Sequence, residues 1–279
     1  MVESRGLRWF LRGATAVTLS FIYLPLLVIC LYAFNERRTT AWPIEGLSVK
    51  WFARAVDNSG VRDALWMSVK AGLGATALAV LLGTLAAIAV SRYRFFGRET
   101  ISFLVILPIA LPGIVTGMAL NTTFRTWGVD LGLFTVIVGH ATFCIVVVYN
   151  NAVARMRRVS GSLDEASADL GADAWQTFRY VTAPQISTAI IAGSLLAFAL
   201  SFDEVIVTTF TISGQETLPI WILSNLSRPN QLPIVNVVAV FVILLSIIPV
   251  WLAQRLAGSS GITAERPKRS TVAANIPES

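Results

Sequence analysis

The chain has 279 residues, of which 55% are apolar and only 14% are charged, and its formal net charge is +6. Soluble globular proteins carry about 25% charged residues, which cover their surface. This composition excludes soluble enzymes, disordered regulators and secreted disulfide-rich domains, and it predicts an integral membrane protein.

Six apolar stretches are long enough to cross a bilayer, since a helical span needs about 20 mostly apolar residues. The first stretch is too long for the apolar part of a cleaved leader, so we expect it to remain as an anchor. The predicted fold is all-α and polytopic, with six transmembrane helices in a membrane domain of residues 13–257. The predicted spans are 13–34, 67–91, 101–121, 132–153, 186–209 and 234–257.

The Lys and Arg residues predict the orientation of these spans. Fourteen of the 22 lie in the 1–12 tail, the 92–98 and 154–185 loops and the segment from Arg255 onward. Cytoplasmic loops are enriched in such residues, which predicts that both termini lie in the cytoplasm. Because the basic residues follow the membrane loops, no nucleic-acid binding is expected. The polar 258–279 tail is expected to be poorly ordered.

The 35–66 loop is the longest predicted external segment. Trp51, Phe52, Ala55 and Val56 recur in it at helical spacing. This pattern predicts a short amphipathic helix along the outer surface of the membrane lipid. We favour packing against the bundle over a binding role for this helix.

The second and third predicted spans differ in how they pack. Small residues recur at every fourth position of the second span, which lets helices approach closely in lipid. The third span holds Pro108 and Pro112, and each proline removes a backbone donor and kinks a helix. Broken backbone at membrane depth needs protein or a water-filled cavity around it, so the prolines mark either a substrate path or a tolerated kink. The small residues are Ala71, Ala75, Ala79, Gly83 and Ala87.

The 154–185 loop has the pattern of a cytoplasmic pair of short helices. Ser162 is placed to cap the first helix, with Glu165 completing a capping box. Gly171 is expected to break that helix, and Pro184 is expected to end the second one before the fifth span.

The same loop carries a family resemblance. The loop resembles the EAA loop of ABC importer permeases, whose pattern is EAA, three residues, Gly, nine residues and Ile-x-Leu-Pro. The spacing is the same throughout, and three positions carry a different small or apolar residue. The stretches HATFC, DEASADLGA, LLAFALSFDEVIVTTF and TLPIWI extend the resemblance, in particular to the second permease of spermidine/putrescine importers. The matching loop residues are Glu165, Ala166, Ser167, Gly171, Val181, Ala183 and Pro184.

This resemblance implies a type I ABC importer permease fold, a location in the bacterial inner membrane and a set of partners. They are a homologous second permease forming a heterodimer, a cytoplasmic ATPase dimer that binds ATP and Mg²⁺, and an extracytoplasmic polyamine-binding protein. The alternative substrates are another small organic solute or ferric iron. No GxxxxGK[ST] phosphate loop occurs, so no cofactor and no enzyme activity are expected in this chain. The implied ATPase-coupling residues are Glu165, Ala166, Ser167, Gly171, Val181 and Pro184.

Two acids of the fifth span mark a predicted substrate pathway or gate. They lie about 25 Å into the span at 1.5 Å per residue, and charges inside a span usually face the bundle interior or a water path. Carboxylates and aromatic faces together suit a polycation, and Phe198 is a further aromatic candidate. The alternative is that the helix ends just before the acids, which then lie at the outer interface or pair with an Arg of the second permease. The predicted pathway or gate residues are Asp203, Glu204, Phe202, Trp221, Pro108 and Pro112.

His140, Cys30 and Cys144 are interpreted as structural. A metal site needs more ligands than the single histidine of this chain supplies, so we expect His140 to be buried with its hydrogen bonds satisfied. The two cysteines lie inside apolar runs without CxxC spacing, which predicts neither a disulfide nor a metal site.

Overall fold

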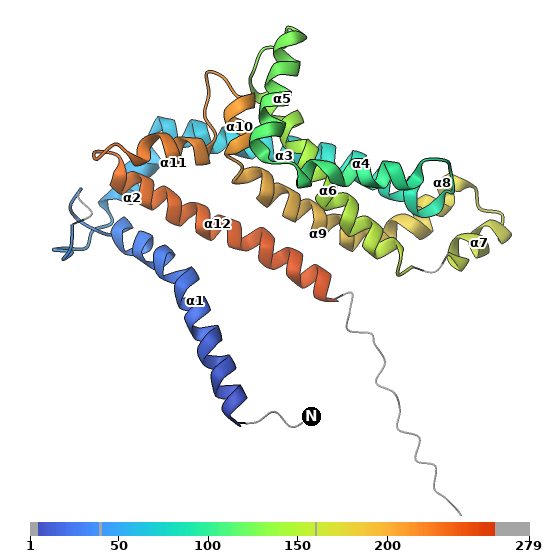
Figure 1. Cartoon of the computed structure of the whole chain (residues 1–279), viewed down its shortest axis with the longest axis horizontal. Coiled ribbons are helices and arrows are strands. Elements are labelled where there is room, and N and C mark those ends of the chain that lie inside the picture. Colours follow the sequence, from blue (N-terminus) through green and yellow to red (C-terminus); the bar gives the residue numbers. More distant parts are fainter. Residues whose placement is uncertain (1–4, 39–40, 160, 260–279) are drawn as a thin grey trace, which may run out of the picture.

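The computed structural model describes residues 5–38, 41–159 and 161–259, and helices make up most of them (Figure 1). Within these ranges the one β-type pairing is an isolated bridge between Asn35 and Leu47. The helices are α1 (Arg5–Ala33), α2 (Lys50–Asp57), α3 (Ser59–Arg92), α4 (Arg98–Ala110), α5 (Gly113–Thr126), α6 (Leu133–Met156), α7 (Ser162–Asp169), α8 (Ala174–Thr177), the π-helix η1 (Phe178–Thr182), α9 (Ala183–Phe202), α10 (Ile206–Thr211), α11 (Leu218–Leu226) and α12 (Leu232–Ser259).

The predicted all-α membrane fold is confirmed. By length and composition, five helices of the described ranges are able to cross a membrane, and there are six if the bent pair α4–α5 is counted as one span. Two predicted spans are wrong in detail. The third is not one helix, because α4 and α5 meet at an angle of 104°. The fifth does not continue to residue 209 as one helix, because α9 ends at Phe202 and α10 begins at Ile206.

The core of the bundle forms where α3 packs against α6 and α9. Ala71, Ala75, Ala79 and Ala87 are completely buried. A Cβ on Gly83 would lie 2.9 Å from the carbonyl oxygen of Ile145, a backbone atom of α6. The predicted stripe of small residues is therefore the face of α3 that allows this close approach.

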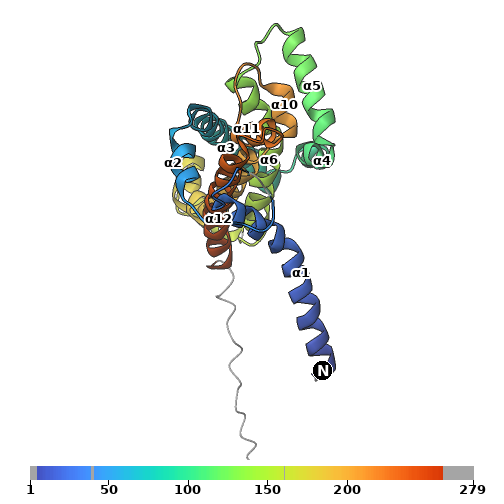
Figure 2. The same cartoon turned by 90° about the vertical axis from the view of Figure 1, so that its left-hand side faces the viewer.

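The first helix, α1, leaves the bundle and packs chiefly on α12 (Figure 2). Ala33 is its one buried residue, whereas Trp9, Phe10 and Phe21 are exposed. An apolar helix with this exposure suits contact with lipid or with another membrane-spanning chain. Because α1 starts at Arg5, most of the predicted 1–12 tail is helical.

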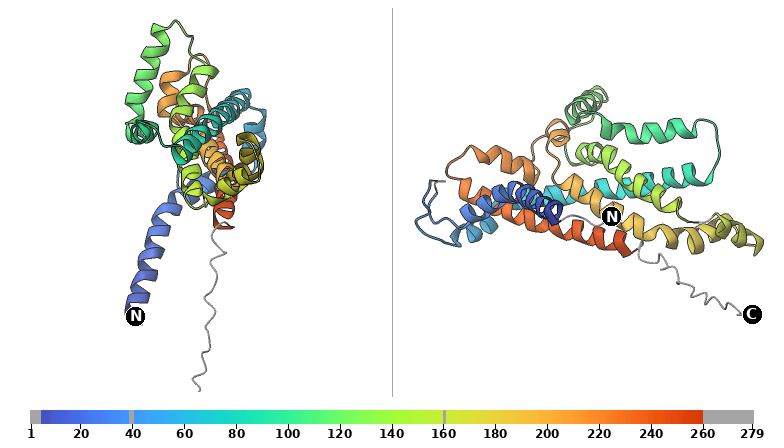
Figure 3. Two further views of the ribbon diagram at one scale, coloured as in Figure 1. Left: turned by 90° about the vertical axis from the view of Figure 1, so that its right-hand side faces the viewer. Right: turned by 60° about the horizontal axis from the view of Figure 1, so that its bottom comes forward.

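The short helices gather at opposite ends of the bundle, α2 and α11 at one end and α7 and α8 at the other (Figure 3). The predicted external helix is α2, which buries Trp51 and Ala55, and the Trp51 indole N–H donates to the carbonyl of Asn35 at 2.8 Å. This burial agrees with a packing role. The next helix, α3, begins at Ser59 rather than near the predicted 67. Of the predicted 258–279 tail, all but the end of α12 lies outside the described residues.

Candidate functional site

The break between α4 and α5 follows from Pro112. A residue that precedes a proline avoids the helical conformation, and Leu111 is extended, with φ −82° and ψ 140°. Pro112 also has no N–H to donate to the carbonyl four residues earlier, in Pro108. Its own carbonyl then accepts from the amides of Val115 and Thr116, which starts α5. Pro108 itself stays inside α4.

The break between α9 and α10 is formed by Asp203, Glu204 and Val205. Oε1 of Glu204 accepts from the amide of Val207 at 2.9 Å, and so satisfies a donor in the first turn of α10. Asp203 follows directly after α9 and is exposed. Helix α9 therefore ends just before the two acids.

The two breaks lie next to each other, because α5 packs on α10 (Figure 2). A Cβ on Gly113 would lie 3.5 Å from Ile206, and one on Gly117 would lie 2.6 Å from the ring of Phe210. The Asn121 amide donates to the carbonyl oxygen of Phe210. The glycines after Pro112 therefore let α10 approach α5 closely, next to the two acids.

His140 of α6 joins the two sides of the second break. It is completely buried, its Nδ1 lies 2.7 Å from the Ser201 hydroxyl of α9, and its Nε2 lies 2.7 Å from the Thr208 hydroxyl of α10. Thr208 donates its one hydroxyl proton to the carbonyl of Glu204, so it accepts from Nε2–H, and Nδ1 accepts from Ser201. The expectation of a satisfied buried histidine is confirmed.

The predicted aromatic residues lie in the buried core. Phe202 and Trp221 belong to one buried apolar cluster, and the rings of Phe198 and Phe202 are 5.8 Å apart. Trp221 also lines a pocket whose described lining does not include Asp203 or Glu204. The structure thus brings Phe202 and Trp221 together in the core.

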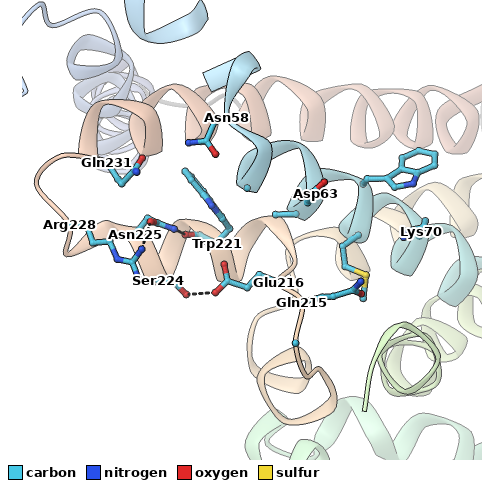
Figure 4. A pocket seen from close by; sticks show the side chains of 15 residues that line it. Asn58, Asp63, Lys70, Gln215, Glu216, Trp221, Ser224, Asn225, Arg228 and Gln231 are labelled. Atoms are coloured by element: carbon cyan, nitrogen blue, oxygen red, sulfur yellow. Dashed lines mark hydrogen bonds between the residues drawn. The ribbon is translucent and has the colours of Figure 1, made fainter. Parts of the chain in front are cut away.

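That pocket lies between α3 and α11 and has a volume of about 620 Å³ (Figure 4). Its walls carry the carboxylates of Asp63 and Glu216 and the cations of Lys70 and Arg228. The Ser224 hydroxyl donates to Glu216 at 3.2 Å. Sequence reasoning missed Asp63 and Glu216, because charged residues are common in loops and near helix ends and so carry no special signal there.

The coupling segment, defined here as residues 161–184, folds as a hairpin of α7 and α8. Gly171 turns the chain with φ of 81°, a conformation that glycine adopts without strain. The hydroxyls of Ser167 and Thr177 lie 2.9 Å apart and join the two arms. The predicted break at Gly171 is confirmed.

Two local predictions for the coupling segment are wrong. Helix α7 begins at Ser162 itself, with Gly161 at the capping position, and the capping box is formed by Asp173 and Gln176 instead. Pro184 does not end the second helix. It lies in the first turn of α9. The π-helix η1 joins α8 to α9, and the Ala183 amide donates to the carbonyl of Phe178, five residues earlier, which is the wider π spacing.

The exposed side of the coupling segment is unusually apolar. The predicted residues Glu165, Ala166 and Gly171 are exposed, whereas Val181 is half-buried. Around them Leu170 and Trp175 expose 89% and 68% of their surface. Apolar and aromatic side chains at the end of a bundle mark a surface for another protein. Leu163 and Tyr180 are also exposed there. Sequence reasoning missed Asp164, which forms an ion pair with Arg92.

The chain is similar to transport proteins in sequence and in fold. Residues 79–259 match the family "Binding-protein-dependent transport system inner membrane component". The chain is 34% identical over 251 residues to the spermidine/putrescine transport system permease protein PotC of Haemophilus influenzae, covering 88% of this chain and 96% of that protein. It is 32% identical over 233 residues to the putrescine transport system permease protein PotI of Escherichia coli, covering 80% and 82%.

A solved structure has the same fold at low sequence identity. The structure is that of a bacterial ABC transporter involved in the import of the polysaccharide alginate, with a TM-score of 0.63 and 18% identity. The match covers 93% of this chain and 99% of that one. The chain therefore belongs to the family of binding-protein-dependent transport system inner membrane components, the permease subunits of ABC importers, which are not themselves enzymes.

Proposed function

We propose that this permease imports polyamines, putrescine or spermidine, across the bacterial inner membrane. It forms a heterodimer with a homologous permease, and the pair works with a cytoplasmic ATPase dimer that holds ATP and Mg²⁺. An extracytoplasmic polyamine-binding protein delivers the solute. Both termini and the coupling segment face the cytoplasm, and α2 and α11 face outward, in keeping with the Lys and Arg distribution.

The exposed carboxylate of Asp203 at a helix break is the observation that carries the substrate class. Discontinuous helices line solute sites in many transporters, and α4–α5 is broken beside α9–α10. A carboxylate there suits an ammonium group. The names of the two relatives, putrescine and spermidine/putrescine permeases, support the same class of solute.

Asp203→Asn is expected to lower spermidine uptake about tenfold, the size of one lost charge-assisted contact. The measurement is ATP-dependent uptake of radiolabelled spermidine and putrescine by proteoliposomes that contain the complete complex and its binding protein. Glu204→Gln is the matched control. Its amide oxygen is able to keep the bond to the Val207 amide, so uptake should stay near wild type.

Normal uptake by Asp203→Asn would remove Asp203 from the pathway and leave the proposed solute intact. A wild-type complex that takes up neither polyamine would remove the polyamine proposal. The solutes to assay are then ferric iron, the alternative from the sequence analysis, and 2-aminoethylphosphonate. The second is chosen because a 27% identical Salmonella typhi relative is named for transport of that compound.

Trp175→Ala is expected to weaken binding of the ATPase subunits about 30-fold, since exposed aromatic residues at protein interfaces often contribute 2 kcal/mol or more. The measurement is the amount of ATPase that co-purifies with the tagged permease. Trp127→Ala is the control, because Trp127 is similarly exposed, at 73%, but lies at the end of α5. Equal co-purification of both variants with wild type would contradict a coupling role for this surface.

A further inference from the structure

The coupling segment is tied to α3 as well as to α9. Arg92 is the last residue of α3, and its Nη1 lies 2.7 Å from Oδ2 of Asp164 in the first turn of α7. The other oxygen of the same carboxylate, Oδ1, accepts from the Thr182 hydroxyl at 3.3 Å, at the base of α9. One carboxylate thus connects α7 both to η1, just before α9, and to α3, which is distant in the sequence.

This ion pair is well shielded. The side chains of Arg92 and Asp164 expose 19% and 27% of their surface, and Thr182 is buried. Ion pairs fully in water contribute little, whereas breaking a shielded pair leaves a charge without a partner. Nε and Nη2 of Arg92 are buried with no acceptor among the described residues. The carboxylate of Asp164 is therefore the acceptor on which this guanidinium depends.

Both helix ends also favour the charges that they carry. Asp164 lies in the first turn of α7, where a negative charge is favourable, and Arg92 lies in the last turn of α3, where a positive charge is favourable. The neighbouring Glu165, by contrast, is exposed. The pair is therefore specific to Asp164.

Helix α3 reaches from this pair to the opposite end of the bundle. It has 34 residues, and Asp63 and Lys70 near its start line the pocket beside α11. A displacement of α7 therefore has two rigid routes into the bundle. One is the direct continuation of α8 through η1 into α9, and the other is the contact from Asp164 to α3.

We propose that Arg92 and Asp164 form a latch that transmits movement of the coupling segment to α3. Both are positioning residues, since neither is expected to touch solute or nucleotide. The proposal rests on the proposed function, in which a separate ATPase moves the coupling segment. Loss of the latch leaves α9 attached to the ATPase but releases α3, which uncouples ATP hydrolysis from transport.

The test uses Asp164→Asn, Arg92→Gln and the charge swap Arg92→Asp with Asp164→Arg in the reconstituted complex. Spermidine transported per ATP hydrolysed is expected to fall about tenfold in each single variant, a usual size for coupling between sites. ATPase co-purification and basal ATPase rate should stay near wild type. The swap should regain part of the lost transport, because it restores the charge pair but places each charge at the helix end that disfavours it and loses the acceptor for Thr182.

A second measurement does not depend on the solute assayed. The rise in ATPase rate produced by the binding protein should be lost in the single variants and return in part in the swap. Arg37→Gln is the control, because its pair with Glu45 is on the surface, with 61% and 52% exposed.

The latch is overturned if transport and basal ATPase rate fall together, if the single variants behave as wild type, or if the assembled swap stays uncoupled. Failure of wild-type uptake would instead count against the polyamine proposal, and the ATPase measurement would still decide the latch.

Discussion

Gly83→Ala is expected to lower the melting temperature of the assembled permease by about 5 °C. The added Cβ would lie 2.9 Å from the Ile145 carbonyl oxygen and 3.2 Å from the Tyr149 amide nitrogen. Backbone atoms in a helix cannot move aside, so α3 and α6 must separate, and such overpacking costs about 1–3 kcal/mol. The measurement is thermal unfolding of the purified complex, which loses a few degrees per kcal/mol.

Gly13→Ala in α1 is the matched control, because no atom lies within 4 Å of the Cβ that it would add. The gain in helix propensity, about 1 kcal/mol, is the same for both substitutions. Equal melting temperatures for the two variants would mean that the close approach of α3 and α6 does not limit stability.

His140→Leu is expected to reduce solute uptake about tenfold, which corresponds to 1.4 kcal/mol. The leucine removes two hydrogen bonds of 2.7 Å and leaves the Ser201 hydroxyl without its ring partner inside the bundle. An orphaned buried hydroxyl costs about 1–3 kcal/mol. With α10 no longer tied to α9, the acids between them lose their fixed position, and uptake by proteoliposomes reports the loss.

Two further variants separate this bridge from general packing. Cys144 lies one turn from His140 on α6, and its thiol makes a weak contact of 3.3 Å to the Ala197 carbonyl. Cys144→Ala removes this contact and should change uptake little. His140→Gln keeps one donor and one acceptor, and should retain more uptake than the leucine. Equal loss in the cysteine and histidine variants would show that the position matters only for packing.

The helical run from Ala174 to Phe202 connects the coupling segment to the α9–α10 break. It has 29 residues and is about 44 Å long at 1.5 Å per residue. The π-helix η1 keeps it continuous past Pro184. This run joins Trp175 to Asp203 in one element, and His140 connects its end to α10.

The wrong local predictions in the coupling segment concern residues that are compatible with more than one position in a helix. Pro184 is compatible with a helix end and with the first turn of the next helix. A Ser-x-x-Glu sequence is compatible with capping, yet the chain starts α7 one residue earlier and uses Asp173 and Gln176 for the capping box. In both cases the choice depends on how the segment packs as a hairpin.

The sequence by itself determined the membrane class, the six apolar stretches, the small-residue face of α3, the turn at Gly171 and the family. These features depend on composition, on periodicity or on the conformation of single residues. None of them requires knowledge of which distant segments of the chain come into contact. The tertiary structure alone decided the 104° bend between α4 and α5, the end of α9 at Phe202 and the contact between the two breaks. It also decided the partners of His140, which lie 61 and 68 residues away, and of Asp164 on α3. Such contacts join distant segments, and their geometry follows from how whole helices pack, which no local pattern in the chain records.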